Sequence, residues 1–169
     1  MRDLLYIGLL ALSMAPGAPI ERKAPDAMGL TKRILCDGKW RGHGIPTGSN
    51  SLATVAHVID GCTVIGWEDN MGKHGTFTAV LKREFKSRKD PQGFDVPVRD
   101  YALLLSDTQF DFWAQIKKRT PRNGEILYSG LILPGNNRVQ YVSGQYIGED
   151  GDGHWEADLT SHPGSSGVP

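Results

Sequence analysis

Ser51-Leu-Ala-Thr-Val-Ala-His57-Val-Ile59 is a short apolar run that places a histidine near its end, directly before the turn residues Asp60 and Gly61. A run of this length, bounded by turn residues, is typical of a β-strand. Similar runs, separated by Gly, Asn, Asp or Pro, continue on both sides of it. The predicted strands are residues 33–36, 42–47, 51–56, 62–67, 76–83, 101–105, 126–133, 139–147 and 153–158. This pattern predicts an all-β fold.

The composition agrees with a chain of many short strands. Its 169 residues fit one domain or two small ones, and 39% of them are hydrophobic, enough to bury a core. The 21 glycines and 10 prolines favour short elements joined by tight turns. The 19 basic and 19 acidic residues give a net charge of zero, so no overall field attracts nucleic acid or an anionic membrane.

One segment departs from the strand pattern. Apolar side chains recur there at every third position, namely Phe110, Trp113 and Ile116. This spacing predicts a short helix or a connecting segment over residues 106–119. The chain divides naturally at this point into a first β unit, residues 30–105, and a second, residues 120–169.

The N-terminal part, residues 1–29, differs from both β units. Residues 4–15 form an apolar run that is too short to span a membrane but has the length of a signal-peptide core. A signal or membrane-proximal segment and a buried or frayed terminal helix are both compatible with it. Residues 16–29 are rich in Pro and Ala and are predicted to be a linker.

Three segments carry residues suited to catalysis. His57 ends the run quoted above, Asp100 begins the apolar strand Arg99-Asp-Tyr-Ala-Leu-Leu-Leu105, and Ser166 lies in Pro163-Gly-Ser-Ser-Gly-Val-Pro169. The order His, Asp, Ser is that of one type of nucleophilic triad. A serine hydroxyl needs a base to take its proton, and the imidazole needs a carboxylate to fix its tautomer and stabilise its charged form.

The triad hypothesis gives each residue a role. His57 is the predicted general base, Asp100 the residue that orients it, and Ser166 the nucleophile, since the Gly-x-Ser-Gly spacing selects it over Ser165. Glycines on either side of the serine pair let the backbone bend sharply. The N–H groups of Gly164 and Ser166 are therefore the predicted oxyanion hole.

The same three segments resemble the motifs of trypsin-like serine proteases. Thr54-Val-Ala-His57-Val resembles their Thr-Ala-Ala-His motif, Asp100-Tyr-Ala-Leu-Leu their Asp-Ile-Ala-Leu-Leu motif, and Gly164-Ser-Ser-Gly-Val-Pro169 their Gly-Asp-Ser-Gly-Gly-Pro motif. The sequence around His57 is most similar to the HtrA-like and glutamyl-endopeptidase branch, and proteases of RNA-virus polyproteins share the outline. The resemblance implies a chymotrypsin-like double β-barrel that cleaves polypeptides without a cofactor.

The resemblance also implies a substrate pocket and a missing part. Thr160, Ser161 and His162 would line the pocket wall, where the lack of an acidic residue disfavours cleavage after Lys or Arg. Family members have further strands after the nucleophile, whereas three residues follow Ser166 here. We therefore expect an incomplete second barrel and a truncated chain that is inactive or weakly active.

The two cysteines and the acidic residues near the C-terminus are interpreted as structural rather than functional. Digestive trypsins close the histidine loop with a disulfide, but Cys62 lies five residues after His57 rather than beside it, so we expect Cys36 and Cys62 to be free thiols. We predict no metal site. Three acidic residues near the C-terminus lack the spacing of a calcium loop and are predicted to form a hairpin turn, namely Asp150, Asp152 and Glu156.

Two further alternatives remain open at this stage. The basic residues within 82–89 are predicted to form a solvated hairpin, with RNA or membrane binding as the alternative. The predicted activity is that of a serine endopeptidase, either a viral polyprotein protease or a secreted or periplasmic enzyme. The alternative of a different class is a catalytically inactive relative that uses the same scaffold as a binding module.

Overall fold

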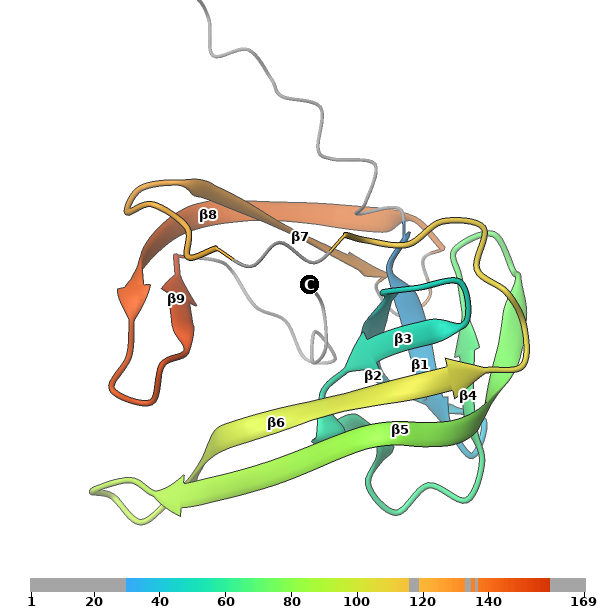
Figure 1. Ribbon diagram of the computed structural model, residues 1–169, viewed down its shortest axis with the longest axis horizontal. Coiled ribbons are helices and arrows are strands. Elements are labelled where there is room, and N and C mark those ends of the chain that lie inside the picture. The colour runs from blue at the N-terminus through green and yellow to red at the C-terminus, as the bar shows by residue number, and fades with distance from the viewer. Residues whose placement is uncertain (1–29, 116–118, 133–134, 136, 159–169) are drawn as a thin grey trace, which may run out of the picture.

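The computed structural model describes residues 30–115, 119–132, 135 and 137–158, and this part of the chain is nearly all β (Figure 1). Its strands are β1 (Lys32–Cys36), β2 (Lys39–Pro46), β3 (Ser51–Thr54), β4 (Ile65–Glu68), β5 (His74–Lys89), β6 (Asp95–Ser106), β7 (Ile126–Ile132), β8 (Val139–Glu149) and β9 (Trp155–Ala157). A 3₁₀-helix, η2 (Ala56–Ile59), follows β3. Each strand overlaps one of the predicted runs, and the all-β prediction is confirmed.

The first six strands close into a barrel in the order β1-β2-β3-β6-β5-β4, with antiparallel pairing throughout. Alternate residues point inward, so that Leu52 of β3 and Leu104 of β6 are fully buried and face each other across the register. Trp67 is also fully buried, and its indole N–H donates to the Ser106 hydroxyl at 2.9 Å. The indole N–H of Trp67 is therefore hydrogen-bonded inside the barrel core.

The strands β7, β8 and β9 form a separate three-stranded sheet in that order. Hydrogen bonds between buried groups attach it to the barrel. The Thr31 hydroxyl donates to the Gly130 carbonyl at 3.0 Å, and the Ile132 N–H donates to Nε2 of the fully buried His43 at 3.0 Å. The sheet thus lies against the start of β1 and the middle of β2.

The hairpin of β5 and β6 is longer than the barrel requires. Pairing continues from Phe77 and Ser106 to Lys89 and Asp95, and the distal half projects away from the barrel (Figure 1). We call residues 84–99 the arm. The basic residues of the 82–89 segment therefore lie in a hairpin, as the structural interpretation expected.

The segment after β6 contains no helix among its described residues, 107–115. Its backbone instead bonds to the β2–β3 region, because the Phe110 N–H donates to the Ser49 carbonyl at 2.7 Å and the Ala114 N–H to the Pro46 carbonyl at 2.9 Å. Phe110 packs on Trp67 in the core. Over these described residues, long-range backbone bonds take the place of the hydrogen bonds of a helix turn.

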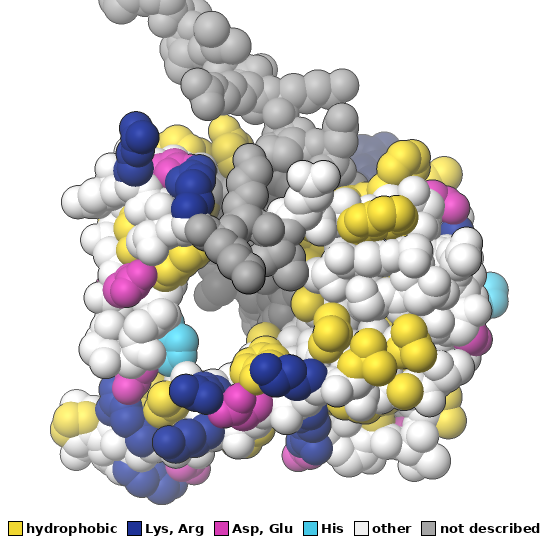
Figure 2. Space-filling model, in the orientation of Figure 1, with side chains coloured by type: hydrophobic (Ala, Val, Ile, Leu, Met, Phe, Trp, Pro, Cys, Tyr) yellow, Lys and Arg dark blue, Asp and Glu magenta, His cyan; other side chains and the backbone are white. Residues whose placement is uncertain are grey.

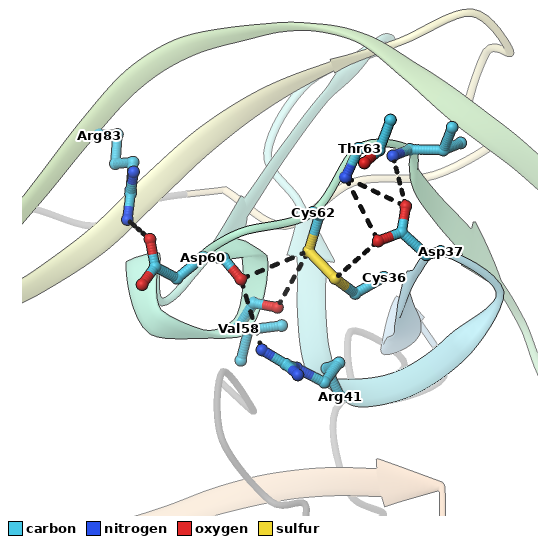
Figure 3. The surroundings of a disulfide bond; sticks show 9 residues. Cys36, Asp37, Arg41, Val58, Asp60, Cys62, Thr63 and Arg83 are labelled. Carbon is cyan, nitrogen blue, oxygen red and sulfur yellow. Dashed lines mark hydrogen bonds and ion pairs between the residues drawn. A yellow bond between two sulfur atoms is a disulfide. The ribbon is translucent and has the colours of Figure 1, made fainter.

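Cys36 and Cys62 form a disulfide, so the expectation of free thiols is wrong (Figure 3). Their Cα atoms lie 5.2 Å apart, within the range of disulfides. The pairing of β1 with β4 brings the residues before β4 next to the end of β1. Asp37 also fixes this loop, because its carboxylate accepts the N–H groups of Thr63 at 3.0 Å and Val64 at 2.7 Å.

The apolar residues 4–15 lie outside the described part of the chain. Among the described residues, no helix is both long enough and apolar enough to cross a membrane.

Candidate active site

The register of β3 and β6 brings His57 and Asp100 together. Thr54 of β3 pairs with Ala102 of β6, so the chain reaches His57 three residues after this pair and Asp100 two residues before it. The 3₁₀-helix η2 contains His57. Its other residues, Ala56, Val58 and Ile59, are buried, whereas His57 is exposed. The apolar residues of the quoted stretch thus anchor the turn, and its histidine faces outward.

Both oxygens of Asp100 are bonded to His57. Oδ2 lies 2.5 Å from the imidazole Nδ1, and Oδ1 accepts the His57 backbone N–H at 3.0 Å. The Asp100 side chain is 12% exposed and the His57 side chain 47%. A shielded carboxylate therefore holds the ring by Nδ1 and fixes its orientation. Nε2, the other ring nitrogen, is then the atom that can accept a proton.

The loop after His57 is held from three directions. The Arg83 guanidinium of β5 bonds to the Asp60 carboxylate at 2.5 Å, and that of Arg41 from β2 donates to the Asp60 carbonyl at 3.4 Å (Figure 3). The disulfide at Cys62 supplies the third link. Sequence analysis missed these roles, since Asp60 had only the signal of a turn residue, Arg83 had that of a basic hairpin, and Arg41 had none.

A second polar cluster lies beside Asp100 on the outer face of β5 and β6. The Tyr101 hydroxyl donates to Glu84 at 2.7 Å, and the Arg99 guanidinium donates to the other oxygen of Glu84 at 2.8 Å. The Tyr101 hydrogen bond, followed by that of Arg99, lowers the pKa of Glu84 below its ordinary value. Lys82 lies over the Tyr101 ring, 5.0 Å from its centroid. The strand that carries Asp100 is thus braced by a network that spans both strands.

The other predicted site residues lie outside the described part of the chain. These are the nucleophile Ser166 with Gly164 of the oxyanion hole, and the pocket residues Thr160, Ser161 and His162. The structure therefore brings together two of the three predicted triad residues, His57 and Asp100, and the roles of the others stay predictions.

The basic residues of the arm are largely paired with acids. Arg88 pairs with Asp152 at 2.8 Å and Lys89 with Asp95 at 2.8 Å. Figure 2 shows Lys and Arg side chains gathered over the arm with acidic side chains between them. Pairing of this kind reduces the field that a nucleic-acid phosphate would meet.

The acidic turn between β8 and β9 is organised by Asp150. Its carboxylate accepts the backbone N–H groups of Asp152 at 2.8 Å and His154 at 2.9 Å. The hydrogen bond from the His154 backbone N–H, followed by that from the His154 ring, lowers the pKa of Asp150 to about 2. The predicted hairpin turn is present, and Asp150, Asp152 and His154 form a compact group at its tip.

Two solved structures similar to this chain are proteases. The serine endoprotease from Yersinia pestis is 18% identical, with a TM-score of 0.59 over 84% of this chain and 49% of that protein. The Rv3671c protease in its inactive form is 14% identical, with a TM-score of 0.63 over 85% of this chain and 71% of that one. This chain thus spans about half of the Yersinia protein. No family model and no curated protein matches it.

The class that these findings define is the chymotrypsin-like fold of serine proteases. A closed six-stranded barrel precedes a partial second sheet, and both similar structures are proteases with this architecture. The predicted fold is therefore confirmed. At these identities the likeness establishes the fold alone, so the activity of this chain is taken up as a proposal below.

Proposed function

We propose that this protein is a serine endopeptidase that hydrolyses peptide bonds through an acyl-enzyme intermediate. The observation that carries the proposal is the bond between His57 Nδ1 and Asp100 Oδ2 at 2.5 Å, on a protease fold. A carboxylate at Nδ1 directs the lone pair of the imidazole to Nε2, which is the arrangement that a general base requires. Polypeptides are the substrate class that this chemistry implies.

The proposed reaction assigns one task to each residue. Ser166 attacks the carbonyl carbon while His57 Nε2 takes the hydroxyl proton, and Asp100 stabilises the imidazolium that forms. The N–H groups of Gly164 and Ser166 stabilise the oxyanion, and a donor of this kind is worth about 2.7–4 kcal/mol. His57 then protonates the leaving amine, and water releases the acyl group by the same base catalysis.

The proposed pocket residues Thr160, Ser161 and His162 offer hydroxyl and imidazole groups and no carboxylate. Such groups suit a polar or acidic substrate side chain better than a basic one. The biological setting, viral polyprotein processing or secreted proteolysis, stays a prediction from the sequence.

A fluorophosphonate probe tests the proposal, because it modifies a serine hydroxyl that a base has activated. We expect labelling of the folded, full-length protein that disappears in Ser166→Ala and persists in the matched control Ser165→Ala. His57→Ala should abolish labelling and keep the fold, since this side chain is 47% exposed. Absence of labelling in a well-folded, full-length protein, or labelling that survives Ser166→Ala, would overturn the proposal and favour the inactive binding module.

A further inference from the structure

The arm and the turn between β8 and β9 are joined at a polar junction. The imidazole Nε2 of His154 lies 2.7 Å from the carbonyl oxygen of Val98 on β6, and the guanidinium of Arg88 on β5 lies 2.8 Å from a carboxylate oxygen of Asp152. Figure 1 shows the β8–β9 hairpin reaching from the second sheet towards the distal half of β5 and β6. The junction therefore links the second sheet to the first barrel at a point remote from His43 and Thr31.

The partners of His154 specify its protonation state. A carbonyl oxygen can only accept, so Nε2 must donate a proton to Val98. The other ring nitrogen, Nδ1, lies 2.8 Å from Oδ2 of Asp150. Asp150 is a carboxylate here, because its Oδ1 accepts two backbone N–H groups, which favour the charged form. Both ring nitrogens of His154 therefore donate, and the ring that satisfies this geometry is the imidazolium.

Loss of a proton from the His154 ring would make one of its two contacts repulsive. A neutral ring carries one lone pair, which would face either the Val98 carbonyl oxygen or the Asp150 carboxylate. Neither oxygen can donate to it. Deprotonation of His154 thus replaces an attraction with a repulsion between two acceptors.

The charged groups around the ring come from each element packed against it. Asp150 and Asp152 lie on its own turn, and β5 contributes Arg88, which is bound to Asp152 and also interacts with Asp90. The facing group on β6 is the Val98 carbonyl. The Asp150 hydrogen bond, followed by that of Val98, raises the pKa of His154 above its ordinary value of 6.5.

The cluster of Asp150, Asp152 and His154 also has the composition of a metal site, but its donor atoms have other partners. Asp150 uses both oxygens within the turn, an oxygen of Asp152 is paired with Arg88, and both nitrogens of His154 are hydrogen-bonded. An ion would have to break these bonds to enter. A proton on His154 satisfies all of them.

We propose that the junction is a proton-dependent clamp, closed on the arm when His154 is an imidazolium and released when the ring is neutral. Because the folded state raises the pKa of His154, the clamp is fully closed below the ordinary value of 6.5 and opens as the pH rises through the raised value. Val98 lies two residues before Asp100 on β6, so the clamp ties the second sheet to the strand that positions His57. The proposal concerns the conformation of the protein and does not depend on proteolysis.

Distance measurement between two spin labels tests the clamp. Gln92→Cys places one label at the tip of the arm, and Gly151→Cys places the other in the turn, where a Cβ meets nothing within 4 Å. Cys36 and Cys62 are bonded to each other, so only the two introduced thiols react with the label. Distance distributions are recorded by pulsed electron spin resonance at about pH 5.5 and about pH 8.5, on either side of the histidine range.

We expect one short distance at the lower pH and a second, longer distance at the higher pH. The ratio of open to closed molecules should rise roughly threefold or more, the effect of a partly exposed charged contact. His154→Gln should abolish this pH response. His74→Gln, which replaces another exposed histidine, is the matched control and should keep it. Equal distributions at both pH values, or an unchanged response in His154→Gln, would overturn the clamp.

Discussion

Removal of the Cys36–Cys62 disulfide should destabilise the protein by a calculable amount. The bond closes a loop with a sequence separation of 26 residues. In the chain-entropy model, closing a loop of this size lowers the entropy of the unfolded chain and thereby stabilises the folded state by about 3.5 kcal/mol at 25 °C. For a protein of this length, that loss corresponds to a decrease in Tm of about 10 °C.

Urea denaturation followed by tryptophan fluorescence measures this loss, because Trp67 is fully buried in the folded barrel. We expect a lower midpoint after reduction, and a steeper dependence on urea because the unfolded chain expands when the link is cut. The double variant Cys36→Ala, Cys62→Ala is the control and should not respond to reductant. A wild-type protein whose midpoint is the same with and without reductant would refute the reasoning.

The effect should be global rather than local to the candidate site. Asp37 keeps its bonds to the backbone of Thr63 and Val64 when the disulfide is absent, so the loop after η2 retains a second attachment. We therefore expect the bond between His57 and Asp100 to survive reduction. The Nδ1 proton resonance of His57 should keep its chemical shift, and its disappearance in the folded, reduced protein would show that the loop depends on the disulfide alone.

Three further predictions address the site, the barrel and the turn. Asp100→Asn should keep the fold and slow fluorophosphonate labelling by about 10⁴-fold, because the imidazole of His57 loses its tautomer; a slowing below tenfold would contradict this role. Gly44→Ala should lower stability by about 1–3 kcal/mol in urea denaturation, because its Cβ would lie 2.8 Å from the Ala53 carbonyl oxygen, whereas Gly151→Ala, with open space around it, should be neutral. Asp150 has a pKa lowered to about 2, so its contribution to stability is complete above its ordinary value and is lost as the pH falls towards 2; amide resonances of the turn should change in that acidic range, separately from any change caused by His154 at higher pH.

The strands of the barrel were predictable because each buries one face. Leu52 and Thr54 alternate with more exposed residues in β3, and Ala102 and Leu104 do so in β6, which is the periodicity that sequence analysis uses. The same alternation predicted His57 at the end of one apolar run and Asp100 at the start of another, whereas β6 begins five residues earlier, at Asp95. Their catalytic role, however, stays a prediction, as does that of Ser166.

The features that sequence analysis missed depend on contacts between distant residues. β5 extends to Lys89 and β6 begins at Asp95, well beyond the predicted ends, because the side chains of the arm are exposed or only partly buried and give a weak strand signal. The disulfide follows from the pairing of β1 with β4, which sequence spacing does not reveal. The junction at His154 requires the arm and the β8–β9 turn to meet, and neither segment alone carries a signal of it.

Closure of the first barrel separates strand edges that are already paired from edges that could pair with another molecule. Within the closed barrel each strand is hydrogen-bonded to a neighbour on both sides, whereas in the arm β5 and β6 pair, among the described strands, only with each other. In the described part of the second sheet, β7 and β9 are the outer strands. The propensity to aggregate in concentrated solution by intermolecular strand pairing should therefore reside in the second sheet and in the arm, and solubilising substitutions belong on their outer edges.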